Sequence, residues 1–272
     1  MPDPLIVPYK TVNDVTLNMH IFKPAHPSAC DPRPVIVLFS CGGWKGWNPA
    51  KFYPQCEYLA SRGMVAVSVE VRVISRHGTT PVECVVDAKS AVRWTRAHAA
   101  ELAIDPGRIV ASGGSAGGHV ACCTAVIDGF DEPHEGQSVS AKPNALVLFN
   151  PVVDLLWLQR RVDVLGGLER ARELSPLHHV RPDLPPTVIF HGRDDAVVDV
   201  EQVIRFQRIM LELRNRCDLY VYPDQGHGFF NYFDGRNPMF TETMRQTDRF
   251  LTSLGYLLGE PTIDEFHRAA QT

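Results

Sequence analysis

The sequence predicts an α/β fold, with a mostly parallel central sheet of about eight strands flanked by helices. Two features of the chain support this class. Short runs of β-branched and other apolar residues alternate with longer stretches in which apolar residues recur at helical spacing. The predicted strand over residues 34–39 is apolar throughout, as expected for a strand that helices cover on both faces.

Each element follows from a local signal. The chain opens with two antiparallel strands that are joined by a turn at Asn13 and Asp14. The first helix ends before Gly63, which suits a left-handed cap, and the second begins after Thr80 with Pro81 in its first position. In chain order, the predicted strands are residues 6–12, 15–22, 34–39, 64–71, 108–112, 145–150, 186–191 and 218–222. The predicted helices are residues 49–61, 81–102, 116–127, 200–215 and 238–257, followed by a tail over 259–272.

The composition favours one domain that spans residues 1–272. Of the 272 residues, 44% are hydrophobic and 21% are charged, which is ordinary for a globular protein. A formal net charge of −4 offers no basic surface for nucleic acid or for an anionic membrane. The longest apolar runs are far too short to span a bilayer. We therefore expect neither nucleic acid nor a membrane as a partner.

A motif typical of a nucleophilic serine lies at residues 113–117, which read Gly-Gly-Ser-Ala-Gly. Alone this pattern is a weak signal, but it follows a predicted strand and opens a predicted helix, which is the setting of a nucleophile elbow. The small neighbours of Ser115 leave room for a tight turn, and the helix N-terminus favours negative charge. The alternative is a glycine-rich turn in which Ser115 only caps the helix.

Two later loops offer the partners that such a serine needs. A base must take the proton of the hydroxyl, and a carboxylate must fix the tautomer of the base. In this arrangement the acid comes next along the chain and the histidine comes last. His227 lies between two glycines after the last strand, whereas His119 lies inside the elbow helix and His191 precedes the acid. Of the adjacent Asp194 and Asp195, which should point in different directions, we favour Asp195 on its spacing from the strand end; either could instead be a solvated turn residue.

Four segments carry a family resemblance. They are residues 104–109 (Ile-Asp-Pro-Gly-Arg-Ile), residues 113–119 (Gly-Gly-Ser-Ala-Gly-Gly-His), the stretch His191-Gly192-x-x-Asp195-x-x-Val198 and residues 226–229 (Gly-His-Gly-Phe). Together they resemble hormone-sensitive-lipase-like and acetyl-esterase/feruloyl-esterase-type carboxylesterases of the α/β-hydrolase superfamily, over roughly residues 33–257. The resemblance implies the α/β-hydrolase fold and a serine carboxylesterase with Ser115 as nucleophile, His227 as base and Asp195 as acid.

The same families carry an oxyanion loop that usually reads His-Gly-Gly-Gly-Trp. Here the corresponding residues are Ser40-Cys41-Gly42-Gly43-Trp44. The oxyanion donors are backbone N–H groups, so Gly42 and Gly43 can still supply them, together with Ala116 after the nucleophile. The two altered side chains leave open how the loop is anchored. The alternative for the glycines is a tight turn after the strand.

The substrate class is less closely defined by the sequence. Trp44, Trp47 and Phe229 are expected near the mouth of the site, where aromatic faces could stack on sugar or phenolic rings or line an acyl pocket. An insertion over residues 154–185 would form a small lid. We expect short-chain esters, acetyl above all, of a carbohydrate or phenolic alcohol. The alternatives are a serine amidase, such as an arylformamidase or peptidase, and a non-catalytic ligand-binding relative.

No metal or other cofactor is expected, since the histidines and acids lack metal-ligand spacing. The seven cysteines are odd in number and form no C-x-x-C pair, so we expect reduced thiols, with a Cys56–Cys84 disulfide as the alternative. The N-terminus has no pattern of a signal peptide. This favours the cytoplasm over a secreted form, while the oligomeric state stays open.

Overall fold

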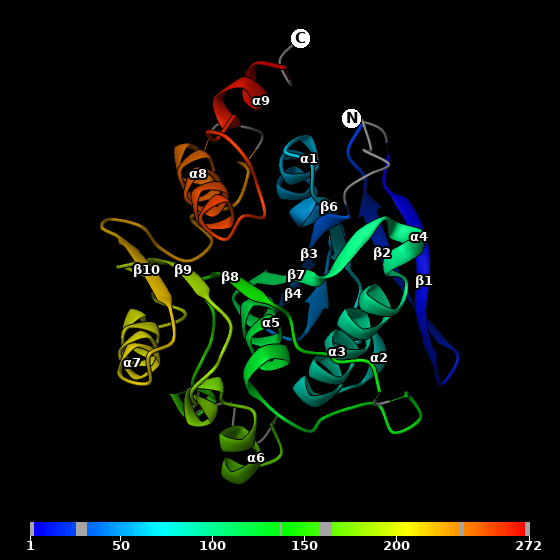
Figure 1. The fold of residues 1–272 in the computed structure, drawn as a ribbon. Coiled ribbons are helices and arrows are strands. Elements are labelled where there is room, and N and C mark those ends of the chain that lie inside the picture. The colour runs from blue at the N-terminus through cyan, green and yellow to red at the C-terminus, as the bar shows by residue number, and fades with distance from the viewer. Residues whose placement is uncertain (1–2, 26–31, 137, 158–164, 234–236, 270–272) are drawn as a thin grey trace.

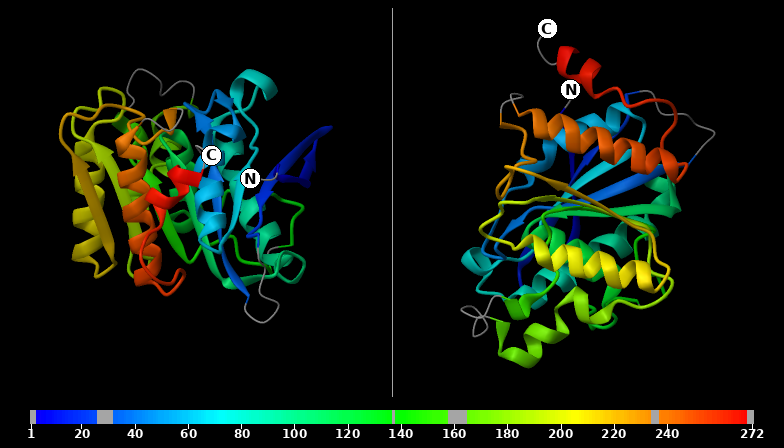
Figure 2. Two further views of the ribbon diagram at one scale, coloured as in Figure 1. Left: turned by 90° about the horizontal axis from the view of Figure 1, so that it is seen from above. Right: turned by 90° about the vertical axis from the view of Figure 1, so that its left-hand side faces the viewer.

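The structure is a computed structural model that describes residues 3–25, 32–136, 138–157, 165–233 and 237–269. An eight-stranded sheet lies between two layers of helices (Figures 1 and 2). Its strand order is β1-β2-β6-β3-β7-β8-β9-β10. β2 runs antiparallel to both β1 and β6, and all other neighbours are parallel. The predicted fold class is confirmed.

The elements agree closely with the predicted ones. The strands of the large sheet are Leu5–Val12 (β1), Val15–Phe22 (β2), Arg33–Phe39 (β3), Val65–Val69 (β6), Ile104–Gly114 (β7), Ala145–Phe149 (β8), Thr187–Gly192 (β9) and Cys217–Tyr222 (β10). A short hairpin pairs Cys41–Gly42 (β4) with Gly46–Trp47 (β5). The helices are Pro49–Phe52 (η1), Tyr53–Ser61 (α1), Ile74–His77 (α2), Pro81–Ala97 (α3), Ala99–Leu102 (α4), Ala116–Val126 (α5), Leu168–Glu173 (α6), Pro176–His179 (η3), Val200–Glu212 (α7), Pro238–Ser253 (α8) and Ile263–Ala269 (α9).

Alternation along the strands builds a core on each face of the sheet. In β3, Val35 and Val37 belong to one buried cluster and Ile36 and Leu38 to the other, because successive side chains of a strand point to opposite faces. The first cluster packs under α3, α5 and α7, and the second under α1, α8 and α9, as the two sides of Figure 1 show. Burial on both faces explains why β8 and residues 34–39 of β3 are apolar throughout.

Several elements differ from the prediction in extent, among them α7 and α8, which end at Glu212 and Ser253 instead of residues 215 and 257. The helix predicted over 81–102 is divided at His98, where α3 ends and α4 begins. β7 starts earlier, at Ile104, because Arg33 of β3 pairs with that residue. The predicted tail contains α9, whose Ile263 is fully buried. Among the described residues, no helix is both long enough and apolar enough to cross a membrane.

The predicted insertion over residues 154–185 contains α6 and η3, and its residues 158–164 lie outside the described part of the chain. Leu155 and Leu174 are fully buried in the same core cluster as α5. The backbone N–H of Leu177 donates to the carbonyl of Val153. The described part of the insertion is therefore packed on the domain.

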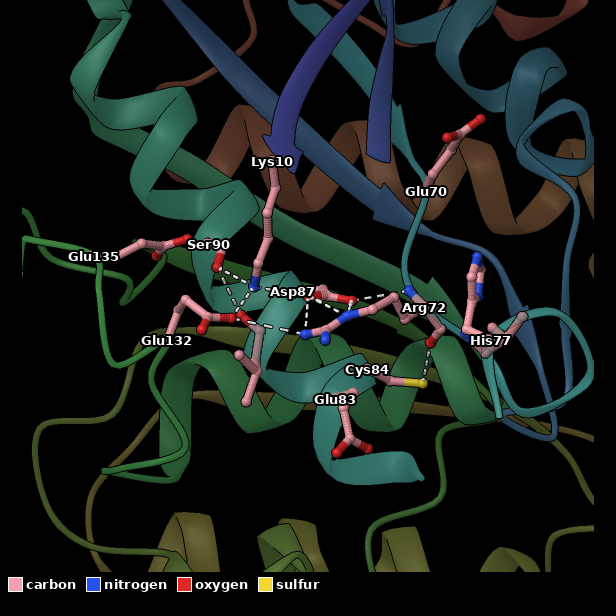
Figure 3. Close-up of polar contacts among 12 residues, drawn as sticks. Lys10, Glu70, Arg72, His77, Glu83, Cys84, Asp87, Ser90, Glu132 and Glu135 are labelled. Carbon is pink, nitrogen blue, oxygen red and sulfur yellow. Dashed lines mark hydrogen bonds and ion pairs between the residues drawn. The ribbon is translucent and has the colours of Figure 1, made fainter. Parts of the chain in front are cut away.

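A buried ionic group, which we call the Asp87 cluster, ties β1 and the loop at 128–144 to α3 (Figure 3). It consists of Lys10, Arg72, Asp87, Ser90 and Glu132. Lys10 Nζ lies 2.8 Å from Asp87 Oδ1 and 2.7 Å from Glu132 Oε2, and it donates to Ser90 Oγ at 3.0 Å. Arg72 binds Asp87 through Nε, through Nη2 and through its backbone N–H. The cluster holds the antiparallel edge of the sheet in place.

Candidate active site

The site lies where the parallel strands end. β7, β8, β9 and β10 are neighbours in the sheet and run in the same direction, so the loops that follow them meet at one edge. Ser115 follows β7 directly, and the loops after β9 and β10 contain Asp195 and His227. Chain segments that are more than a hundred residues apart are thereby brought together.

Ser115 occupies the sharp turn between β7 and α5, with φ 57° and ψ −122°. A residue other than glycine is strained in this region, and such strain persists only where the surroundings hold it. Gly117 shows how tightly the turn is held, because a Cβ at that position would clash with the carbonyl oxygen of Phe39, at the end of β3. The small residues of the motif are thus required by close packing, and the predicted strand–turn–helix geometry is present at Ser115.

A chain of hydrogen bonds links the three predicted catalytic residues. His227 Nε2 lies 3.0 Å from Ser115 Oγ, and His227 Nδ1 lies 2.8 Å from Asp195 Oδ2. With the Nδ1 hydrogen donated to the carboxylate, Nε2 has a free lone pair and accepts the hydroxyl hydrogen of Ser115. This is the geometry that a nucleophile and its base require.

Of the two adjacent aspartates in the loop after β9, Asp195 is the one that contacts the histidine. Asp194 is exposed, whereas the side chain of Asp195 is fully buried. Asp195 Oδ1 accepts hydrogen bonds from the backbone N–H groups of Val197 at 2.8 Å and Val198 at 2.9 Å. Burial alone would raise the pKa of the Asp195 carboxyl, but the hydrogen bonds from His227 and from these two backbone groups outweigh it and lower the pKa below its usual value. Asp195 is therefore held as a carboxylate that faces the ring.

The predicted oxyanion donors lie beside the serine. Gly42 and Gly43 line the same cavity as Ser115 and belong to the hairpin formed by β4 and β5. Gly43 has a φ of 56°, a conformation that favours glycine. Ala116 is the first residue of α5, where a backbone N–H has no partner within the helix.

Trp44 and His119 anchor this hairpin, which answers the question left open by Ser40 and Cys41. Trp44 Nε1 donates to His119 Nδ1 at 3.2 Å, and His119 Nε2 donates to the carbonyl of Leu174, after α6, at 2.7 Å. Burial of His119 lowers its pKa to about 4, so the ring is neutral near pH 7 and can accept at one nitrogen while it donates at the other. The hairpin, the elbow helix and the insertion are thereby joined through one side chain.

A cavity of about 460 Å³ opens in front of Ser115. Trp47 lines it as predicted, with the guanidinium of Arg76 over its ring at 4.8 Å from the centroid. The predicted substrate contacts of Trp44 and Phe229 are not supported, because neither lines the cavity. Trp44 is buried against His119, and Phe229 packs between the rings of Tyr222 and Phe230. The other aromatic and amide or amine side chains of the wall are Asn48, Lys51, Phe52, Asn150, Phe230 and Asn231.

The structure also bears on cysteine and metal chemistry. Among the described residues, no group of three or more histidine, cysteine or acidic side chains could hold a metal ion. Cys56 and Cys84 are both free thiols, so the alternative of a disulfide between them is wrong, and Cys30 lies outside the described residues.

The chain has clear relatives among proteins of known sequence. It is 30% identical to the probable carboxylic ester hydrolase LipM of Mycobacterium tuberculosis over 214 residues, which cover 72% of this chain and 49% of LipM. It is 28% identical to an acetylxylan esterase of Xylanibacter ruminicola over 240 residues, which cover 82% of this chain and 46% of that protein. The chain thus spans about half the length of these curated relatives.

Similar structures cover nearly the whole chain. The apo form of Thermogutta terrifontis esterase 2 has a TM-score of 0.91 and 45% identity, and the match covers 96% of this chain and 98% of that one. That esterase has also been solved with propionate bound and after phosphorylation by paraoxon, each with a TM-score of 0.90 and 44% identity. The BD-FAE family model matches residues 19–210. The chain therefore belongs to the BD-FAE family and has the α/β-hydrolase fold of its esterase relatives.

Proposed function

We propose that the protein is a serine carboxylesterase that hydrolyses short-chain esters. The observation that carries this proposal is the hydrogen-bonded chain from Asp195 through His227 to Ser115 at the wall of an open cavity. A complete set of three residues favours an enzyme over a non-catalytic ligand-binding relative. The paraoxon-phosphorylated state of the Thermogutta esterase supports the same class, because organophosphates modify activated serines.

In the proposed mechanism, Ser115 Oγ attacks the ester carbonyl carbon while His227 Nε2 takes its proton. The negative charge on the carbonyl oxygen is stabilised by the backbone N–H groups of Gly42, Gly43 and Ala116. His227 then protonates the leaving alcohol, and an acyl-enzyme remains on Ser115. A water molecule, activated by the same ring, releases the acid and restores the serine.

We propose acetyl and other short acyl groups as substrates, on a carbohydrate or phenolic alcohol. Among the relatives, the Thermogutta esterase has been solved with propionate and with butyrate, and another relative is an acetylxylan esterase. The residues of the cavity wall include the aromatic Trp47 and Phe230 and the amides Asn48 and Asn231, a combination that suits a ring carrying hydroxyl groups.

The first test is Ser115→Ala, assayed with p-nitrophenyl acetate. We expect kcat/KM to fall on the order of 10⁶-fold, with an unchanged thermal unfolding curve. Ser112→Ala is the matched control, since Ser112 is a buried serine on β7, the strand that precedes Ser115, and does not line the cavity. Paraoxon should label the wild-type protein and Ser112→Ala but not Ser115→Ala. Full activity of Ser115→Ala would remove the proposed function.

The second test is a series of p-nitrophenyl esters from acetate to decanoate, together with the matched anilide, p-nitroacetanilide. We expect the highest kcat/KM for acetate to butyrate and little turnover of the anilide. A preference for decanoate would contradict the short-chain proposal. Faster turnover of the anilide would point to an amidase that uses the same three residues.

A further inference from the structure

Asn150 lies at one edge of the sheet, between the chain segments that contain Ser115 and Asp195. It follows β8 directly, and β8 lies between β7 and β9 in the sheet. Its backbone N–H donates to the carbonyl of Phe190 in β9 at 2.7 Å, and the backbone N–H of Ser115 donates to Phe149, the residue before Asn150, at 2.9 Å. The residue is fully buried and lines the cavity. Its position relative to the site is therefore fixed by the backbone on both sides.

The carboxamide of Asn150 lies against the catalytic ring. Its Nδ2 is 3.2 Å from His227 Nδ1, the same nitrogen that lies 2.8 Å from Asp195 Oδ2. The Nδ1 hydrogen is directed at the carboxylate, so Nδ1 has no lone pair for a second donor. Meanwhile Asn150 Oδ1 is buried and has no hydrogen-bond partner within the described part of the chain. A half-turn of the carboxamide removes the conflict at Nδ1, because it places Oδ1 beside the Nδ1–H group, while Nδ2 takes the buried position of Oδ1.

We infer that Asn150 is a positioning residue that gives the His227 ring a second hydrogen-bond acceptor beside Asp195. The inference rests on the proposed esterase function. In this role the amide oxygen restrains the rotation of the ring and faces the positive charge that the ring gains when it takes the proton of Ser115. A neutral acceptor does this without placing a second buried carboxylate next to Asp195.

The geometry has a further consequence for the acid itself. An aspartate at position 150 would place a carboxylate oxygen where Nδ2 now lies, 3.2 Å from His227 Nδ1. The backbone there has a φ of 34°, which aspartate and asparagine tolerate better than most residues and glycine tolerates freely. Position 150 is thus a second point in the fold from which a carboxylate can serve the histidine.

The first experiment compares Asn150→Gly with the wild-type protein in the p-nitrophenyl acetate assay. Glycine removes the carboxamide and keeps the backbone conformation. We expect kcat to fall about tenfold, as for the loss of one hydrogen bond to a charged ring, with KM changed less than about twofold. An unchanged kcat, or a loss confined to KM, would overturn the inference, because the side chain would then contact substrate or act only in the fold.

The second experiment moves the carboxylate. Asp195→Asn should lose most activity, and the double variant Asp195→Asn/Asn150→Asp should regain at least about tenfold in kcat. The matched control, Asp195→Asn/Asn150→Gly, should regain nothing. A purely structural role of Asn150 predicts no rescue, so absence of a gain in a double variant with a wild-type unfolding curve would overturn the inference. Failure of the proposed function itself is recognised separately, by activity that survives in Ser115→Ala.

Discussion

Two buried aspartates of this protein, Asp87 and Asp195, differ in the groups that contact their carboxylate oxygens. Asp87 is surrounded by fixed positive charge, from the guanidinium of Arg72 and from the ammonium group of Lys10, at 2.7–2.8 Å. Asp195 has one oxygen on two backbone N–H groups and the other on His227, whose side chain keeps 27% of its exposure. The side chains that contact the first carboxylate are a guanidinium and an ammonium group, and the backbone N–H of Arg72 also donates to it. The second has a partner that can gain and lose a proton.

The difference in partners indicates that Asp87 stabilises the fold, whereas Asp195 is suited to assist a proton transfer. A buried carboxylate that is paired with buried cations holds distant segments of the chain together. Its removal leaves those cations buried without a compensating negative charge. A buried carboxylate bound to a titratable ring lets charge appear and disappear beside the substrate at little structural cost. The comparison predicts that substitutions of Asp195 and Asp87 change different measured quantities.

The largest effect is expected for Asp195→Asn. The amide would favour the wrong tautomer of His227, so kcat should fall about 10⁴-fold, equivalent to about 5 kcal/mol of transition-state stabilisation. The urea midpoint should move little, because the two backbone hydrogen bonds to Oδ1 can be kept. Both quantities are measured on the same preparation. A large loss of stability with a modest loss of kcat would place Asp195 in the same class as Asp87.

The next effect is the reverse and concerns Asp87→Ala. It leaves Arg72 and Lys10 buried with less compensation, so we expect a loss of about 3–5 kcal/mol in the free energy of unfolding, measured by urea denaturation. The kcat per folded molecule should stay near the wild-type value when active sites are counted by titration with paraoxon.

An exposed ion pair provides the control for Asp87. Glu173 and Arg170 lie 2.7 Å apart on α6, with about 45% of each side chain exposed. Glu173→Ala should change the free energy of unfolding by less than about 0.5 kcal/mol. Equal losses from the exposed and the buried substitution would contradict the assignment of the Asp87 cluster as a main stabilising contact.

The smallest of the three effects is a dependence of stability on pH that originates at His119. Burial lowers its pKa from 6.5 to about 4, so the unfolded chain binds the proton more readily than the folded chain. The stability contributed by neutral His119 is complete above pH 6.5 and is lost as the pH falls toward 4, by about 3 kcal/mol in all. Asp195, whose pKa is lowered, acts in the same direction but over the more acidic range of a carboxyl group.

The variant His119→Gln separates the two contributions, because glutamine can accept from Trp44 and donate to Leu174 without titrating. Its free energy of unfolding, measured by urea denaturation from pH 7 to pH 4, should depend less steeply on pH between 6.5 and 4 than that of the wild-type protein. The remaining slope comes from His178, His191 and His267, whose pKa values are also lowered by burial. An unchanged slope in the variant would assign the acid sensitivity to other groups.

The parts of the site that were predictable from the sequence are those with local signals. Ser115 is marked by its strand–turn–helix setting, and the order of acid and histidine along the chain indicated the loops of Asp195 and His227. The structure brings these three residues into hydrogen-bond contact. The mostly parallel sheet follows from the same kind of information, since strands buried on both faces are rich in apolar residues, whereas the order of the strands comes from the structure alone.

Orientation of individual side chains was not predictable in this way. Phe229 and Phe230 are adjacent and chemically identical, and which ring faces the cavity depends on the backbone turn at Gly228, with a φ of 79°. Trp44 has a φ of 58°, which is rare for a large side chain, and it turns toward His119 instead of the cavity. A backbone conformation that tertiary packing determines produces no hydrophobic periodicity in the sequence, so periodicity cannot predict it.

Contacts between distant segments were also beyond the sequence. Lys10 and Asp87 are joined across 77 positions, and neither lies in a recognisable motif. Asn150 is the last residue of a predicted strand, and only the three-dimensional structure places its amide beside the catalytic ring. Long-range polar pairs of this kind depend on how the elements pack, which a single sequence does not report.

The contact between Gly117 and the carbonyl of Phe39 limits how this chain can be recombined with its relatives. The end of β3, which leads into the oxyanion hairpin, and the helix behind Ser115 fit together without a gap. Chimeras with one breakpoint between residues 40 and 116 would take these two surfaces from different parents and risk a mismatch at the catalytic serine. In chimeras with breakpoints before β3 or after α5, both surfaces come from the same parent. Libraries that vary the rim of the cavity should therefore exchange segments outside residues 40–116.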